Sequence, residues 1–435
     1  MKFSESDKLR EKAHQLIPGG CHTYAKGDDQ YPAQSPGFIT RGLGCHVWDA
    51  DGNEFIEYGM GLRSVTLGHA YRPVIEAAAN QMKLGNNYTR PAAIEVEYAE
   101  ELVSTIPCAD MVKFAKDGST VTTAAIKLAR AFTGRELVAL CKDHPFFSYN
   151  DWFIGTTAMN AGIPESAVRD SLGFGYNDLT SITELFDRYP GQVAAVILEV
   201  EREQPPLDGF LDKLKSLCAA RGAVLIFDEM ITGFRWEVGG AQEVYGVLPD
   251  LATFGKGIAN GFALSVLAGR RDIMELGGIR HDGDRVFLLS TTHGAENHAI
   301  AAAQATLEIY RSEDVIGHLR RQGLRLAREI NQVSKAHGLL DFVQVLGHPS
   351  NLIFATRDPD GNPSQIYRTL MLQELIRSGI IAPSLVVSYS HSDEDIDKTV
   401  CAFDDAMQIY KKALDVGAQK FVIGPSVKPV FRARN

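Results

Sequence analysis

The chain has 435 residues, of which 45% are hydrophobic and 23% charged, values typical of a folded enzyme with more than one domain. Its formal net charge is −10 and it has no dense basic cluster, which argues against nucleic acid or an anionic membrane as a partner. A charged start and short apolar runs predict neither a signal peptide nor a membrane span. Six cysteines without a C-x-x-C pair favour a reduced, cytoplasmic setting.

The N-terminal part alternates apolar and polar residues. The stretches 38–41, 46–49 and 54–58 are predicted to form small antiparallel strands, with a tight turn at 51–53. We therefore expect an N-terminal segment, residues 1–72, that carries these strands and packs with the small domain.

The middle of the chain alternates helical patterns with short apolar runs. The runs 193–200 and 223–227 are almost continuously apolar, as expected of strands buried on both faces of a mostly parallel sheet. This alternation predicts an α/β fold, with a large domain over residues 73–325 whose sheet lies between helices. The other expected elements are helices at 74–84, 92–106 and 120–132, and strands at 112–115, 137–140, 251–254 and 286–289.

The C-terminal part, residues 326–435, is predicted to be a small α+β domain. Ser392 and Asp395 have the spacing of a capping box, which places the start of the last helix. The expected elements are a long helical region from about 299 to 337, strands at 342–346 and 352–355, and helices at 365–378 and 393–413.

Two adjacent acids, Asp228 and Glu229, follow the apolar run 223–227. Ligands of open α/β sheets bind beyond the carboxyl ends of the strands, so an acid there can pair with a cationic ring nitrogen. A solvated acid or a helix cap explains the same residues equally well. The strand alone leaves both interpretations open.

A lysine, Lys256, follows the next apolar run and is flanked by Gly255 and Gly257. Small neighbours let a bulky cofactor approach the amine, and partial burial lowers its pKa so that it can act as a nucleophile. A surface lysine in a flexible loop is the alternative. Lys256 and Asp228 on neighbouring strand ends together match what pyridoxal 5'-phosphate (PLP) requires: a Schiff-base lysine and an acid for the pyridinium nitrogen.

A phosphate cup is predicted where residues 116–120 end a strand and open a helix. Free N–H groups at a helix start, with the hydroxyls of Ser119 and Thr120, bind phosphate, although an ordinary N-cap has the same composition. The stretch 290–296, which includes Thr292, offers a further hydroxyl. No P-loop, no G-x-G-x-x-G between a strand and a helix, and no zinc motif is present, so nucleotide cofactors and metal are not expected.

These motifs together resemble the class III aminotransferases of the fold-type I PLP superfamily, in particular the glutamate-1-semialdehyde 2,1-aminomutase branch. The resemblance covers most of the chain. It rests on the stretches 17–20, 47–54, 67–69, 114–130 and 228–235 and on Lys256.

The resemblance implies a role for each matching residue. Lys256 would form the internal aldimine, and Asp228 would hold the pyridinium nitrogen. Gly118 and Ser119 would contact the phosphate, and Thr292 would reach it from the neighbouring subunit of a homodimer.

Two further residues would contact the ring itself. Phe146 would stack on the ring where the aminomutase carries an aromatic residue, usually Tyr, and Met230 would pack on a ring face.

The departures from the family pattern lie at substrate positions. Lys26 stands where the aminomutase has its carboxylate-binding Arg, and a lysine cannot make the bidentate fork. Leu62 replaces a pocket Trp and is followed by Arg63, while Glu201 lies in an altered acidic stretch after a strand. Lys26, Arg63 and Glu201 are therefore the candidate substrate residues.

We expect an aminotransferase that moves an amino group between an amino donor and a small polar carbonyl compound. The alternatives are an aminomutase, a PLP racemase or decarboxylase on the same fold, and a catalytically silent binding module. The silent module is disfavoured because it has no need for Asp228, Lys256 and the phosphate cup together.

Overall fold

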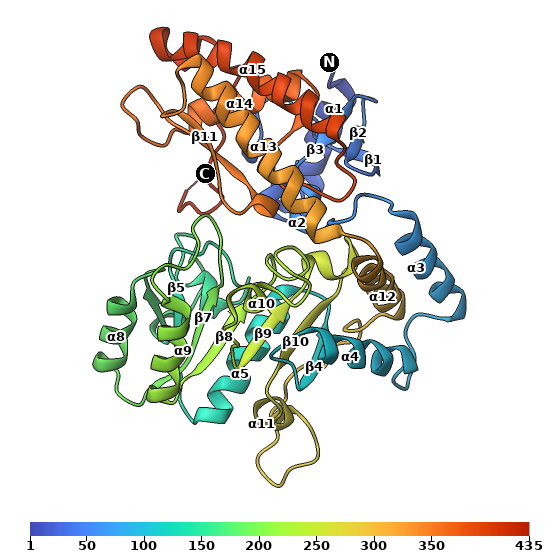
Figure 1. The fold of residues 1–435 in the computed structure, drawn as a ribbon, viewed down its shortest axis with the longest axis vertical. Coiled ribbons are helices and arrows are strands. Elements are labelled where there is room, and N and C mark those ends of the chain that lie inside the picture. Colours follow the sequence, from blue (N-terminus) through green and yellow to red (C-terminus); the bar gives the residue numbers. More distant parts are fainter. Residues whose placement is uncertain (435) are drawn as a thin grey trace. The chain divides into compact units, whose positions relative to one another are not determined.

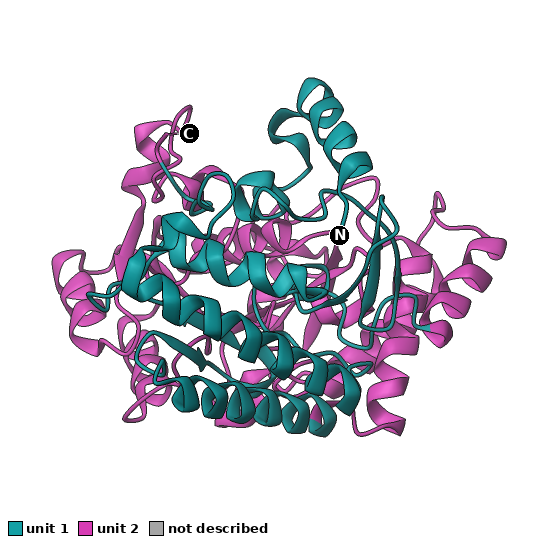
Figure 2. Ribbon diagram, turned by 90° about the horizontal axis from the view of Figure 1, so that it is seen from above, with its two compact units in different colours: residues 1–71, 317–432 teal, residues 72–316, 433–435 magenta. Residues whose placement is uncertain are grey.

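The structure is a computed structural model and describes residues 1–434. The chain divides into two compact units, coloured separately in Figure 2: unit 1 comprises Met1–Tyr71 and Gly317–Arg432, and unit 2 comprises Arg72–Ile316 with residues 433–434. The second boundary precedes the one expected from the sequence by nine residues, because helix α13 (Val315–His337) belongs almost entirely to unit 1. None of the helices within residues 1–434 is long and apolar enough to cross a membrane.

Unit 2 is built on a seven-stranded sheet in the order β4-β10-β9-β8-β7-β5-β6. β10 runs antiparallel to both of its neighbours, and the other pairs are parallel, so the mostly parallel sheet is confirmed. The central strands β7 to β10 are buried along their whole length, as expected of strands in a sheet that is covered on both faces. The strands are β4 (Met111–Ala115), β5 (Leu137–Cys141), β6 (Ser171–Phe174), β7 (Val193–Glu199), β8 (Val224–Asp228), β9 (Leu251–Phe254) and β10 (Ser265–Gly269).

Helices flank this sheet (Figure 1), and α5 packs against β4, β10, β9, β8 and β7. Its buried face is rich in small and β-branched residues, which lets the helix lie close to the strands. The helices are α3 (Arg72–Leu84), α4 (Ala93–Thr105), α5 (Gly118–Thr133), α6 (Asp151–Ile154), α7 (Glu165–Arg169), α8 (Leu179–Arg188), α9 (Phe210–Arg221), α10 (Ala241–Tyr245), α11 (Arg271–Met274) and α12 (Asn297–Ser312), with 3-10 turns η4 (Lys256–Ala259) and η5 (Glu275–Gly277).

Unit 1 combines a four-stranded sheet, order β1-β2-β3-β13, with a two-stranded sheet of β11 and β12. Arg325 and His337 of α13 form ion pairs with acids of α15, so these two long helices lie side by side, as Figure 1 shows. The strands are β1 (Ile39–Leu43), β2 (His46–Asp49), β3 (Glu54–Glu57), β11 (Val343–Leu346), β12 (Ile353–Thr356) and β13 (Ile380–Ile381). The other helices are α1 (Ser4–Leu16), α2 (Met60–Arg63), α14 (Gln365–Arg377) and α15 (Asp393–Val416), with 3-10 turns η1 (Pro18–Gly20), η2 (Tyr24–Lys26), η3 (Asp28–Gln30), η6 (Pro349–Asn351) and η7 (Ala418–Lys420).

The capping box predicted before the last helix is confirmed. Ser392 Oγ accepts a hydrogen bond from the Asp395 amide at 3.2 Å, and an Asp395 carboxylate oxygen accepts one from the Ser392 amide at 2.9 Å. These reciprocal bonds satisfy amides at the start of α15 that the helix itself leaves without partners.

The expected strand at 286–289 is wrong. These residues join no sheet, and the Phe287 side chain is 73% exposed, although the Leu288 side chain is buried. The seven-stranded sheet instead contains β10, which the sequence analysis did not identify. The sequence analysis also missed β6.

The single long helical region expected from 299 to 337 is also wrong. The chain leaves the helical conformation at Glu313, whose φ and ψ are −125° and 150°, and α12 and α13 are separate helices on either side of it. The helix α1 was not predicted either. Its first amides donate to the Asp51 carboxylate at 2.8 Å, a cap supplied from 45 residues along the chain.

Candidate active site

The carboxyl ends of β8 and β9 place Asp228 beside Thr253 in the sheet. Asp228 is only 3% exposed, and its Oδ1 accepts hydrogen bonds from the Met230 amide and the Thr253 hydroxyl, both at 3.1 Å. These bonds fix the carboxylate in one orientation. A carboxylate has about four acceptor positions, so capacity remains for a further donor.

The electrostatics of Asp228 reflect its burial. Loss of water and, next, the Glu199 carboxylate raise the pKa of Asp228, whereas the nearby Lys256 lowers it. Glu199 lies directly opposite Asp228 in the parallel register of β7 and β8. A cationic ring nitrogen beside Asp228 would favour its ionised form, so this buried acid suits the pyridinium group of PLP.

Lys256 follows β9 and begins η4. Its φ of 45° lies in the left-handed region, which is uncommon for a residue with a side chain. A Cβ on the preceding residue, Gly255, would lie 2.6 Å from Met230 Sδ and 2.7 Å from Ser265 Oγ. Glycine is therefore required immediately before the lysine, because the Met230 and Ser265 side chains already occupy the space.

The predicted phosphate cup forms the N-terminus of α5. Asp117 caps this helix by accepting from the Thr120 amide at 2.9 Å, which leaves the amides of Gly118 and Ser119 at the open helix start. A Cβ on Gly118 would lie 3.0 Å from Met230 Sδ. The same methionine therefore contacts both Gly118 and Gly255, and the helix start, Asp228 and the lysine turn lie around it.

The aromatic candidates separate clearly by burial. Phe146 is 47% exposed and meets Phe153 edge to face at 5.7 Å, whereas Phe147 is 2% exposed and belongs to the core. The Tyr149 amide donates to Ser119 Oγ at 3.0 Å, which holds this loop against the phosphate cup. Phe146 is thus the phenylalanine of this loop whose ring is available to a ligand.

Thr292 lies in the exposed segment between η5 and α12. Its carbonyl oxygen accepts from Asn87 Nδ2 at 2.9 Å, which anchors the backbone of the segment. Within residues 1–434, the side chain of Thr292 itself makes no hydrogen bond to unit 2.

Glu201 has two hydrogen-bond donors inside the protein. It is 5% exposed and accepts from Trp236 Nε1 at 2.7 Å and from the Tyr245 hydroxyl at 2.5 Å. Both bonds tie the segment after β7 to neighbouring parts of unit 2. The arrangement indicates that Glu201 positions the structure around the site.

Glu229 differs from its neighbour Asp228 in what it contacts. It is fully buried and accepts from the Ala241 amide at 2.8 Å and the Gln242 amide at 2.9 Å, at the start of α10. Glu229 is therefore a helix cap, and Asp228 is the acid that faces the lysine turn.

The sequence analysis gave no role to Glu199 or His144, which lie near this end of the sheet. Glu199 ends the neighbouring strand, and its amide donates to Nδ1 of His144 at 3.0 Å. Burial, and then the charge of Arg202, lower the pKa of His144 to about 3, so the ring is neutral and carries its proton on Nε2. Only the position of His144 beyond β5 hinted at this, and a lone histidine is more often structural.

The two basic candidates from the N-terminal segment lie in unit 1. Lys26 ends η2 and is exposed, while Arg63 ends α2 with a φ of 71° and donates from Nε to Asn351 Oδ1 at 2.7 Å. Leu62, at the expected pocket position, also has a positive φ of 58°.

A parallel sheet with a lysine and an acid at adjacent strand ends, beside an open helix start, defines a PLP-dependent enzyme. Residues 29–407 match the family of class-III aminotransferases, so the chain belongs to this family, whose members use pyridoxal phosphate. The expected family and cofactor are confirmed.

Several relatives are similar over nearly their whole length. A glutamate-1-semialdehyde 2,1-aminomutase of Acetivibrio thermocellus is 34% identical, covering 92% of this chain and 97% of the relative. A 3-aminobutyryl-CoA aminotransferase of Cloacimonas acidaminovorans is 30% identical, covering 95% and 99%. The FumI protein of Sphingopyxis sp. MTA144, solved in its PLP internal aldimine form, is 27% identical with a TM-score of 0.87 and covers 95% and 98%.

Proposed function

We propose that this chain is an aminotransferase that binds PLP covalently through Lys256 and moves an amino group from an amino donor to a small polar carbonyl compound. The observation that carries the proposal is the pairing of Asp228 with Lys256 at the ends of β8 and β9. A buried acid with a raised pKa beside a lysine in a strained backbone conformation is typical of a built catalytic site.

The residues around this pair would hold the cofactor. Gly118 and Ser119 would bind its phosphate through the amides of the helix start, and Asp228 would accept a hydrogen bond from its ring nitrogen. Phe146 and Met230 would cover the ring. When bound, PLP supplies a ring that accepts the electron pair left behind when a proton leaves the substrate carbon.

The protein's own groups would control the proton. The amine of Lys256, once the substrate amine has displaced it, would take the proton from the substrate Cα. It would then deliver that proton to the cofactor carbon bonded to the substrate nitrogen. Asp228 would stay ionised and keep the ring nitrogen protonated.

The proposed unit is a homodimer in which Thr292 would reach the phosphate of the partner subunit. Support comes from the exposed apolar residues of the same segment, Ile279 at 76% and Phe287 at 73%, which suit an interface. The six cysteines are free thiols, which supports the proposed cytoplasmic setting.

Aminomutase chemistry is the second candidate, favoured by the 34% identical relative of that name. Lys26 and Leu62 argue for another substrate because they replace the aminomutase residues at these positions. The products distinguish the two reactions. An aminotransferase releases one keto product for each amino donor consumed, whereas an aminomutase converts its single substrate into an isomer and releases none.

The experiment for Lys256 is borohydride reduction of the holoenzyme followed by mass spectrometry of its peptides. We expect the cofactor mass on Lys256, and Lys256→Ala should lose the adduct and the absorption band of the bound aldehyde. Lys142→Ala is the matched control, because Lys142 is an exposed lysine just beyond β5 of the same sheet. An adduct that persists in Lys256→Ala would contradict the proposal.

A further inference from the structure

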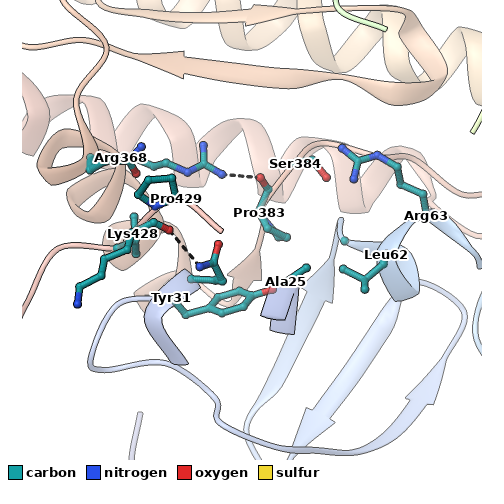
Figure 3. A pocket seen from close by; sticks show the side chains of 13 residues that line it. Ala25, Tyr31, Leu62, Arg63, Arg368, Pro383, Ser384, Lys428 and Pro429 are labelled. Carbon is teal, nitrogen blue, oxygen red and sulfur yellow. Dashed lines mark hydrogen bonds between the residues drawn. The ribbon is translucent and has the colours of Figure 1, made fainter. Parts of the chain in front are cut away.

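Unit 1 contains a pocket of about 240 Å³, shown in Figure 3. Its walls come from the segment 25–31, from α2 and α14, from the residues after β13 and from the C-terminal tail. Three of the residues that line it, Arg63, Arg368 and Lys428, carry a positive charge, and none of the lining residues is acidic.

Arg368 is the half-buried cation at the centre of this pocket. Its guanidinium donates to the Pro383 carbonyl oxygen at 2.7 Å and lies over the Phe354 ring, 5.4 Å from the centroid. Within residues 1–434 it forms no ion pair, and burial lowers its pKa. Arginine has five N–H donors, so most of its hydrogen-bonding capacity remains for a ligand.

A second polar group faces the same space. Ser384 is 5% exposed and lines the pocket. Figure 3 shows Ser384 between the side chains of Arg368 and Arg63. A serine hydroxyl can both donate and accept a hydrogen bond, so one that lines the pocket can bind a polar ligand there.

Tyr31 supplies a third donor on the opposite wall. Burial, together with the charge of Glu57, raises the pKa of Tyr31 to about 12, so its hydroxyl keeps its proton at neutral pH. Glu57 itself does not line the pocket, and its Oε2 pairs with His69 Nε2 at 2.7 Å. The nearest acid is therefore already occupied by another partner.

We propose that this pocket binds the carboxylate of a small organic acid, held by Arg368, Ser384 and Arg63. A buried cation without an acid is costly, and a bound carboxylate would offset that cost with paired hydrogen bonds. The remaining lining includes Ala25, Leu62 and Val427, which suit a short apolar body. The volume lies below the roughly 300–1,000 Å³ of drug-sized sites, so the ligand is small.

The test is calorimetric titration of the full-length holoenzyme with glutarate, with neutral glutaramide as the reference compound. Arg368→Gln should weaken glutarate binding by about tenfold to a hundredfold, and Ser384→Ala should weaken it to a smaller degree. Lys411→Gln is the matched control, because it removes a positive charge from an exposed lysine of α15 that does not line the pocket. We expect this control to bind glutarate within about twofold of the unmodified protein.

Two results would overturn the proposal: binding of glutarate no tighter than glutaramide, or an equal loss in Lys411→Gln and Arg368→Gln. The cofactor absorption band and a thermal unfolding curve show whether each variant is folded. If Arg368→Gln does not fold, Ser384→Ala, which removes only one hydroxyl, is the variant that tests the pocket.

Competition kinetics then identify the source of the acid. Glutarate competes with a carboxylated amino donor if the pocket takes the substrate's own acid group, and changes turnover without competing if a separate molecule binds. Binding itself is measured without turnover, so its failure leaves the chemistry proposed for Lys256 untouched.

Discussion

The two units each contain a buried charge of opposite sign. Unit 2 buries the acid Asp228, whose Oδ1 accepts from a backbone amide and a threonine hydroxyl, and unit 1 half-buries the cation Arg368, which donates to a backbone carbonyl. In both places neutral groups orient the charge, although the nearby Lys256 also lowers the pKa of Asp228. Such a charge costs folding stability, so each site would be stabilised by a ligand whose charge complements it.

Among the tests of this comparison, the variant Asp228→Asn has the largest expected effect. Asparagine keeps the acceptor for Met230 and Thr253 but cannot hold a protonated ring nitrogen, so turnover should fall by about a hundredfold or more, the scale of losing an acid–base group. Steady-state kinetics with a fixed amino donor measures this loss.

The stability of the cofactor-free Asp228→Asn protein should change in the opposite direction. The raised pKa of Asp228 means that its contribution is present below the ordinary carboxyl range and is lost as pH rises through the folded-state value. The variant should therefore be more stable than the unmodified protein by roughly 1–2 kcal/mol at pH 8 and show less difference at pH 4. A variant that is less stable at pH 8 would show that Asp228 is already neutralised within the protein.

Gly255→Ala tests the packing around the lysine turn. The new Cβ would lie 2.6 Å from Met230 Sδ, and overpacking of this kind costs about 1–3 kcal/mol. We expect weaker PLP binding and a lower unfolding temperature. Gly283→Ala is the control, because its Cβ would meet only His281 Nδ1, at an ordinary 3.5 Å. Equal effects in the two variants would show that the close packing around Gly255 has no special importance.

A smaller effect comes from histidines, of which each unit buries one. Burial lowers the pKa of both His144 and His391 to about 3, so the stability that each contributes is present above pH 6.5 and is lost as pH falls. Between pH 7 and pH 5 each should cost up to about 2 kcal/mol of unfolding free energy.

Denaturant titration at several pH values measures this loss. His144→Gln should flatten the pH dependence over this range, while His22→Gln, at an exposed position, should not. The same slope in both variants would mean that His144 is not held neutral.

Much of unit 2 was predictable because its signals are local. Asp228 and Lys256 each stand directly after a buried strand, and parallel strands bring such ends to one edge of the sheet. Glu199 and His144 were not recognised, because their link depends on the strand register and on a bond between segments 55 residues apart.

Unit 1 was less predictable because its pocket is assembled from distant segments. Arg63 stood out as a charge in an unexpected place, but nothing near Arg368 or Ser384 in the sequence marks them as neighbours of Arg63. The run 286–289 misled for a related reason, since an apolar pattern does not show whether a sheet is available to receive it.

The helix cap made by Glu229 has a consequence for mutagenesis of this strand end. Its carboxylate is enclosed by α10 amides, and a Cβ on Gly240 would lie 2.6 Å from its carboxyl carbon, so there is no room for another side chain to take its place. Loss of activity in a Glu229 variant would therefore reflect a loss of folded protein. A screen that scores only activity would confuse this residue with Asp228, for which we propose a role in catalysis, so soluble yield has to be measured alongside turnover.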